Sequence, residues 1–162
     1  MRHTALLFVL LLLLSVPASA PAKIVKSFPD DFLWGTAISG FQSEMGVGAP
    51  SDPNTDWWVW VRDAGNVGTR VSGDLPENGP GFYNLFDTDA RAARKRLHNN
   101  ALRLGIEWSR IFPTSTAAVD ISGGITPAVL AALDALADQG AVAHYRQVFT
   151  ALRARKLVPM VT

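Results

Sequence analysis

The chain has 162 residues, and its 15 Lys and Arg nearly balance its 14 Asp and Glu. This balance gives no electrostatic footprint for a nucleic acid or for an anionic lipid surface. Cysteine is absent, which excludes disulfides, thiolate chemistry and lipoprotein attachment. His98 and His144 lack metal-ligand spacing, so we expect both on the surface of helices and expect neither a metal nor an organic cofactor.

The first 20 residues have the pattern of a cleavable secretory signal peptide. Arg2 supplies a positive charge, residues 5–14 are continuously apolar, and Ala18-Ser19-Ala20 is a small-x-small cleavage pattern. An apolar run of ten residues is too short to cross a hydrocarbon core of roughly 30 Å as a helix. We therefore predict a signal peptide over 1–20 and a mature, secreted or periplasmic chain over 21–162, not attached to a membrane after cleavage. The alternative is an uncleaved N-terminal anchor.

Three short apolar runs predict strands, at residues 32–37, 101–106 and 157–162. Each run is more continuous than alternating, which favours strands buried on both faces of a parallel sheet. Between the first two runs, residues 44–80 are rich in Gly, Pro, Asn and Asp. A connection of this length favours a functional loop.

Helices are predicted between the strands. Phe86, Ala90, Ala93 and Leu97 recur at helical spacing, with basic residues on the other side. A second helix is expected to begin at the N-cap Thr126-Pro127 and to be broken by Gly140. A third has the apolar stripe Val142, Tyr145, Phe149 and Leu152, with Arg146, Arg153 and Arg155 facing water.

This strand–helix alternation leaves two architectures, an open doubly wound sheet or a (β/α)8 TIM barrel. The turn after the first strand lacks G-x-G-x-x-G, which argues against a dinucleotide-binding domain. A barrel has eight strands and about 250 residues. The sequence therefore predicts an α/β chain holding an incomplete TIM barrel, about the first three strands and two helical layers.

Polar residues follow the first two predicted strands, where barrel enzymes build their active sites. Residues 39–44 and 107–113 contain Gln, Glu, Trp and Arg. Amide groups can form paired hydrogen bonds with adjacent sugar hydroxyls, and aromatic rings offer apolar faces to a pyranose. Composition alone makes this a weak indication of a sugar site.

Four sequence motifs, which occur in a fixed order, are more specific than this composition. They are Phe28-Pro29-x-x-Phe32-x-Trp34-Gly35, Gln42-x-Glu44, residues 72–81 (SGDLPENGPG), and Arg103-x-x-x-Glu107-Trp108-Ser109-Arg110-Ile111-Phe112-Pro113. Together they resemble the N-terminal part of glycoside hydrolase family one, from about residue 27 to 162. Residues 42–46 and 52–57 look like the subgroup typified by archaeal β-glycosidases.

The resemblance implies a (β/α)8 barrel and retaining hydrolysis of β-linked glycosides, in which one carboxylate attacks the anomeric carbon and another protonates the leaving oxygen. In the family the acid/base lies in an Asn-Glu-Pro motif after strand four, and the nucleophile in a Glu-Asn-Gly motif after strand seven. With three predicted strands, we expect no catalytic residue in this chain. We expect the chain alone to be an inactive N-terminal fragment.

Two positions take a role from the resemblance. Gln42 matches the glutamine that binds sugar hydroxyls, and the alternative is a buried amide that ties loops together. Arg103 matches the arginine that keeps the nucleophile ionised, and the alternative is a structural ion pair inside the barrel.

The other conspicuous side chains are interpreted as structural. Glu107 and Glu44 have the look of general acids, but the resemblance makes them scaffold residues. Trp57, Trp58 and Trp60 are assigned to helix packing rather than to a sugar-stacking platform. Arg110, Asp74 and Glu77 are assigned to the locking of loops.

The predicted function is that of an O-glycosyl hydrolase of the β-glucosidase or β-galactosidase type, with a small β-glycoside as its partner. The alternative is a non-catalytic remnant or sugar-binding fragment.

Overall fold

A computed structural model describes residues 27–69 and 72–162. The predicted signal peptide therefore lies outside the described residues. The chain divides into two units, one up to Phe32 and one from Leu33 to Thr162. In the described end of the first unit, the Phe32 N–H donates to the Pro29 carbonyl at 3.0 Å, closing a turn. No helix in the described ranges is long and apolar enough to cross a membrane.

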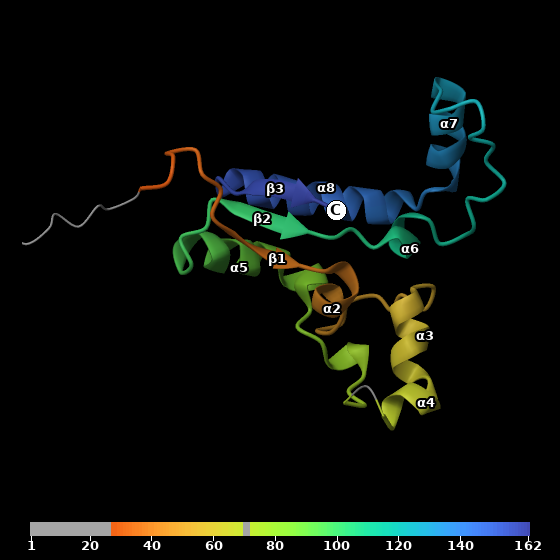
Figure 1. The fold of residues 1–162 in the computed structure, drawn as a ribbon, viewed down its shortest axis with the longest axis horizontal. Coiled ribbons are helices and arrows are strands. Elements are labelled where there is room, and N and C mark those ends of the chain that lie inside the picture. Colours follow the sequence, from red (N-terminus) through yellow and green to blue (C-terminus); the bar gives the residue numbers. More distant parts are fainter. Residues whose placement is uncertain (1–26, 70–71) are drawn as a thin grey trace, which may run out of the picture. The chain divides into compact units, whose positions relative to one another are not determined.

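The second unit is built on a parallel sheet of three strands in the order β1 (Gly35–Ile38), β2 (Ala101–Leu104) and β3 (Val158–Val161) (Figure 1). All three predicted strands are confirmed, although β1 begins three residues later than predicted. Backbone extension alone does not make a strand, and β1 has a partner for its ladder only where β2 begins, at Ala101.

Two long helices cover one face of this sheet. They are α5 (Phe82–Lys95), which joins β1 to β2, and α8 (Gln139–Ala154), which precedes β3. Their apolar sides meet alternate residues of β2 in a single core, made of Phe82, Ala90, Ala93, Leu102, Leu104, Val148, Leu152 and Leu157. The first and third predicted helices are thus present, as α5 and α8.

The opposite face of the sheet is open, which corrects the prediction of strands buried on both faces. Arg103 lies between the buried Leu102 and Leu104 and is exposed, and its register neighbour Met160 is 47% exposed. Side chains alternate across a strand, so the face away from α5 and α8 carries these residues. In a closed barrel this face lines the interior.

The boundary between the last two helices differs from the prediction. Thr126 caps α7 (Pro127–Leu136) as expected, its hydroxyl accepting from the Val129 N–H at 3.3 Å. Gly140, however, lies inside the first turn of α8 and does not break a helix. The break comes earlier because Asp138 caps α8, its carboxylate accepting from the Ala141 N–H at 2.9 Å.

Short helices occupy the connections that lead from β1 and β2. The predicted loop 44–80 contains α3 (Asp56–Arg62), α4 (Ala64–Val67) and the 3-10 turn η1 (Pro76–Asn78). Helix α2 (Gly40–Glu44) follows β1 directly, and α6 (Trp108–Ile111) follows β2. Both therefore start at the carboxyl end of the sheet.

Candidate active site

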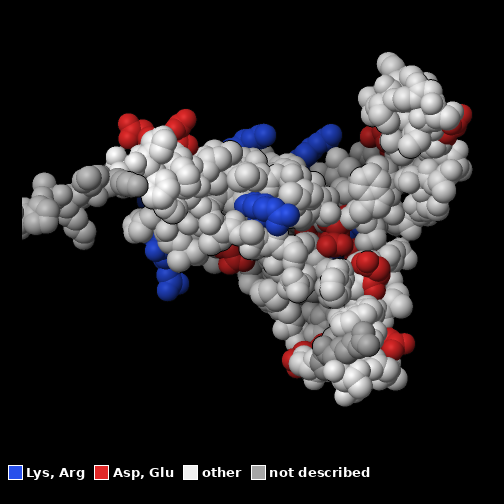
Figure 2. Space-filling view, in the orientation of Figure 1, with Lys and Arg blue, Asp and Glu red and all other residues white. Residues whose placement is uncertain are grey.

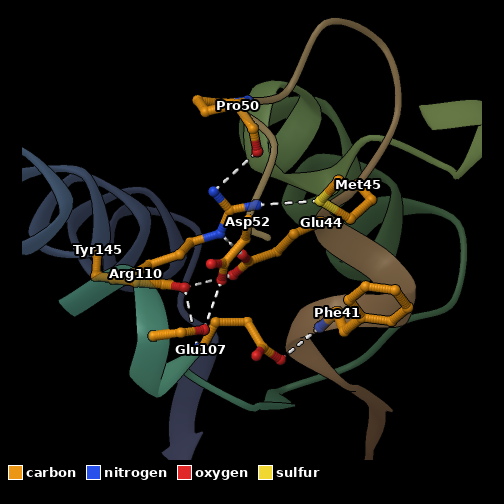
Figure 3. Close-up of polar contacts among 9 residues, drawn as sticks. Phe41, Glu44, Met45, Pro50, Asp52, Glu107, Arg110 and Tyr145 are labelled. Atoms are coloured by element: carbon orange, nitrogen blue, oxygen red, sulfur yellow. Dashed lines mark hydrogen bonds and ion pairs between the residues drawn. The ribbon is translucent and has the colours of Figure 1, made fainter. Parts of the chain in front are cut away.

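The carboxyl ends of β1 and β2 bring α2 and α6 together. The Gly105 N–H donates to the Ile38 carbonyl at 3.3 Å, which extends the strand pairing by one step. The two segments then diverge into α2 and α6, whose polar side chains face each other (Figure 3). The predicted clustering of residues 39–44 and 107–113 is present.

The centre of this cluster is a buried ion pair between Glu44 of α2 and Arg110 of α6. The Arg110 Nε donates to Glu44 Oε2 at 2.8 Å, and the two side chains are 7% and 1% exposed, respectively. The remaining guanidinium nitrogens donate to the Pro50 carbonyl at 3.0 Å and to the Met45 sulfur at 3.3 Å (Figure 3). Arg110 therefore holds the segment that follows α2 against α6, as its assignment to loop locking predicts.

Tyr145 of α8 joins this pair to Glu107, the N-cap residue of α6. Its hydroxyl donates to Glu44 Oε1 at 2.8 Å and accepts from the Glu107 N–H at 3.1 Å. Burial raises the pKa of Glu44, and this effect is opposed by the Tyr145 hydrogen bond and the Arg110 charge. Burial also raises the pKa of the Tyr145 hydroxyl, which keeps it protonated and able to donate.

Glu107 is bound to the backbone that starts α2. Its carboxylate accepts from the Phe41 N–H at 2.5 Å. Gly40 makes this approach possible, because a Cβ there would lie 2.5 Å from the Cγ of Glu107. Burial raises the pKa of Glu107, with the Phe41 hydrogen bond acting in the opposite direction. Glu107 therefore positions α2, in agreement with its interpretation as a scaffold residue.

Gln42, the predicted sugar-binding residue, lies in the middle of α2 and is exposed. The Ser39 hydroxyl donates to its Oε1 at 2.7 Å, which leaves the amide NH2 group without a partner among the described residues. This placement is not that of a buried amide tying loops together. Its neighbours Phe41 and Glu44 are buried, so the backbone beneath Gln42 is held from both sides.

Arg103 lies on the open face of the sheet, in register between Ala37 of β1 and Met160 of β3. Its side chain makes no ion pair with any described residue. Both neighbours are uncharged, so this part of the face presents an unopposed positive charge. Arg103 lies in β2, and Gln42 lies in α2, which follows the neighbouring strand β1. No hydrogen bond within the described ranges joins the two residues.

The tryptophan cluster lies on α3, as expected for a helical element, but its packing is shallow. The Trp57 and Trp60 rings meet edge to face with centroids 5.6 Å apart, and the Arg62 guanidinium lies 3.5 Å from the Trp58 ring centre. Trp57 remains 48% exposed, and α3 has no buried residue.

The tripeptide Glu77-Asn78-Gly79 also occurs in the sequence, but it does not follow a strand. It forms η1 and the residue after it, ahead of α5, and Glu77 forms an ion pair with Arg62. Asp74 accepts a hydrogen bond from the Ser72 hydroxyl at 2.7 Å. Glu77 and Asp74 therefore hold local loop structure, and neither is placed as a barrel nucleophile.

The two histidines differ from their predicted surroundings. His98 is exposed but lies after α5, in a left-handed conformation with φ of 56°. His144 is in α8 and half-buried, stacked on Tyr83 with ring centroids 3.6 Å apart. Burial lowers the pKa of His144. No group of three or more His, Cys, Asp or Glu suited to a metal occurs in the described ranges.

Sequence reasoning missed two members of the cluster. Tyr145 was predicted only as part of an apolar stripe, although a buried tyrosine needs a partner for its hydroxyl and so signals a polar contact. Asp52 was quoted only within a motif, yet it is 5% exposed and accepts from the Ser109 hydroxyl at 2.7 Å.

The described residues form parallel strands joined by helices on one face, with polar residues at the carboxyl ends of the strands. This is the arrangement of part of a (β/α)8-barrel enzyme. The described residues hold three of the eight strands of that fold. The sequence matches the family model of glycosyl hydrolase family 1 over residues 24–162. The chain therefore belongs to glycosyl hydrolase family 1.

Curated relatives agree with this assignment. A beta-galactosidase of Pyrococcus woesei is 47% identical over 143 residues, an alignment that covers 79% of this chain and 28% of the relative. A beta-galactosidase of Sulfolobus acidocaldarius is 41% identical over 142 residues, covering 80% of this chain and 29% of the relative. The chain thus spans under a third of the length of these proteins.

Solved structures give the same result for the fold. The beta-glycosidase of the hyperthermophile Thermosphaera aggregans superposes with a TM-score of 0.74 at 41% identity, covering 84% of this chain and 31% of that one. A hyperthermophilic beta-glucosidase of Pyrococcus furiosus gives a TM-score of 0.72 at 35% identity, covering 85% and 32%. The incomplete barrel and the archaeal-type subgroup predicted from the motifs are confirmed.

Proposed function

We propose that this chain is part of a retaining β-glycosidase that hydrolyses short β-linked glucosides, galactosides or related sugars. The observation that carries the proposal is the family match over residues 24–162, supported by relatives described as beta-galactosidases. The chain spans about 29% of those relatives. In the proposed enzyme, the two carboxylates come from barrel segments other than the three strands described above.

The reaction divides the work between those carboxylates and the residues of this chain. One carboxylate attacks the anomeric carbon while the other protonates the leaving oxygen, and water then releases the sugar. Gln42 would bind adjacent hydroxyls of the sugar, since its amide NH2 group is exposed and its backbone is fixed by Phe41 and Glu44. Arg103 would lie beneath the nucleophile, where a guanidinium favours the ionised carboxylate.

We also propose that the protein is exported. The support is the sequence of residues 1–20 alone, with its positive start, apolar run and Ala-Ser-Ala exit. N-terminal sequencing of protein secreted by the native host or a bacterial host tests this. A mature N-terminus near Pro21 is expected, and an intact Met1 on the isolated protein would contradict export by cleavage.

The central test is an activity assay on the gene product that carries this sequence. We expect hydrolysis of nitrophenyl β-glucoside or β-galactoside, with the β-anomer of the free sugar as the first product by NMR. The α-anomer as first product would refute the retaining mechanism. The polypeptide of residues 21–162, assayed in parallel, is expected to give no turnover above background, and turnover by it would place the catalytic pair within this chain.

The role of Gln42 has its own test. Gln42→Ala removes about two hydrogen bonds of about 0.5–1.5 kcal/mol each, so kcat/KM should fall about fivefold to 150-fold. Gln147→Ala is the matched control, because Gln147 is an exposed glutamine on α8. Equal kcat/KM for both variants would remove Gln42 from the sugar site.

The role of Arg103 is tested by the pH profile. Loss of a neighbouring guanidinium raises the pKa of a carboxyl by roughly 1–3. Arg103→Met should therefore move the acidic limb of kcat/KM to higher pH, while Arg103→Lys moves it less. A lower rate with an unmoved acidic limb would show that Arg103 is structural only.

A further inference from the structure

Basic residues are concentrated at the C-terminal ends of the two long helices. Seven basic residues lie within two short segments, 91–96 at the end of α5 and 153–156 at the end of α8. They are Arg91, Arg94, Lys95, Arg96, Arg153, Arg155 and Lys156. Since α5 leads into β2 and α8 into β3, this group lies at the amino ends of the strands. The candidate active site lies at the carboxyl ends. In the view of Figure 2, separate blue side chains lie over the sheet and helices, and red side chains lie at several places, among them the region of α2 and α3.

Five of these seven side chains line one cavity of about 330 Å³ between the helix ends. The lining consists of Arg91, Arg94, Lys95, Ala154, Arg155 and Lys156. Charge repulsion disperses five cations unless something holds them, so their presence around one hollow needs a physical reason.

The arginines of the cavity are held in place by neighbouring acceptors. Arg94 donates to the Asn99 carbonyl at 2.8 Å, and Arg155 donates to the Ala151 carbonyl at 3.0 Å. Asp87 pairs with both Arg91, at 3.1 Å, and Arg155. One half-exposed carboxylate thus fixes two guanidinium groups without neutralising the cavity.

The two lysines of the cavity are exposed, and neither makes an ion pair in the described part of the chain. Lys156 has φ of 57°, the left-handed conformation that glycine usually fills after a helix. At this position a lysine keeps the cation at the rim of the cavity despite the backbone cost.

A charge balance shows that the cavity stays positive. Five cations and the Asp87 carboxylate leave a net charge of four. The C-termini of α5 and α8 each contribute about half a negative charge, which subtracts roughly one more. The remainder is about three positive charges around the cavity, and the helix dipoles alone do not compensate it.

We propose that this cavity is a binding site for a multiply charged oxyanion of the phosphate or sulfate type. Guanidinium groups bind such oxyanions through paired N–H donors, and the two ammonium groups add point charges at the rim. The volume leaves room for an oxyanion carried as an ester on a larger molecule. The site is separate from the candidate active site and does not depend on the proposed glycosidase activity.

Isothermal titration with inorganic phosphate tests the proposal on the purified protein. Sodium chloride keeps the ionic strength constant, because screening alone weakens any cationic surface. The test variant K95Q/K156Q removes two lining cations, and the control R96Q/R153Q removes two cations from the same helix ends that do not line the cavity. Circular dichroism confirms that both variants keep the native fold.

We expect phosphate to bind the native protein, and we expect the dissociation constant to rise tenfold or more in K95Q/K156Q and less than twofold in R96Q/R153Q. Equal weakening in both variants would mean a general positive field and would overturn the proposal, as would an absence of binding to the native protein. A second titration, with dextran sulfate, identifies the source. Variant-sensitive binding of the polymer assigns a polymer-borne group, whereas binding of phosphate alone assigns the free ion.

Discussion

Replacement of Arg110 by methionine should be strongly destabilising. Methionine keeps much of the apolar volume but removes the charge that faces Glu44 at 2.8 Å, in a site where the two side chains are only 7% and 1% exposed. Loss of one partner from a buried ion pair leaves an uncompensated charge and costs about 3–5 kcal/mol. Loss of the hydrogen bonds to Pro50 and Met45 acts in the same direction.

Urea unfolding followed by circular dichroism measures this loss as the difference in extrapolated unfolding free energy. Arg91→Met is the matched control, because Arg91 pairs with Asp87 across one turn of α5 with side chains 63% and 48% exposed. An exposed pair of this kind contributes about 0.3–0.5 kcal/mol. If Arg110→Met costs no more than Arg91→Met, the ion pair is solvated in solution and the description of a buried cluster is wrong.

Three further outcomes follow from the same cluster. Gly40→Ala should lower the unfolding free energy by about 1–3 kcal/mol, because the new methyl group displaces Glu107 from the Phe41 N–H. Gly123→Ala, whose Cβ would meet no heavy atom within 4 Å, should change it by less than about 0.5 kcal/mol. Equal urea midpoints for the two variants would contradict this. Tyr145→Phe should cost about 1–3 kcal/mol in the same assay, because Glu44 Oε1 and the Glu107 N–H lose their common partner. Burial raises the pKa of Glu44 above 4.5, so the folded protein holds the proton in a pH range where the unfolded chain has released it, and this contribution to stability falls as pH rises through that range. The unfolding free energy of the native protein minus that of Glu44→Gln should therefore decrease as pH rises above 4.5, and a difference that increases would refute the sign.

The elements of the fold could be predicted because their signals are local. Thr126-Pro127 caps a helix through the chemistry of two neighbouring residues, and the apolar stripe of α8 follows from spacing alone. The start of β1 could not be placed in this way, because the ladder of β1 depends on where β2 begins, about 65 residues later in the chain. The open face of the sheet also escaped prediction, since an apolar run such as 157–162 has the same sequence pattern whether or not another part of a barrel covers it.

The candidate site, like the fold, could be predicted only in part. Four of its residues could be predicted, since Gln42, Glu44, Glu107 and Arg110 all fall in segments that follow a strand. Tyr145 and Asp52 could not, because neither lies directly after a strand. The hydrogen bonds that connect the cluster could not be predicted, because they join residues at least 38 positions apart. Glu107 shows the consequence most clearly. A carboxylate after a barrel strand has the same sequence signature as a general acid, and only the Phe41 N–H on its oxygen and the Gly40 that admits it give it a structural role. A glycine five residues after the start of β1 is thus the sequence feature that separates a scaffold glutamate from a catalytic one in this chain.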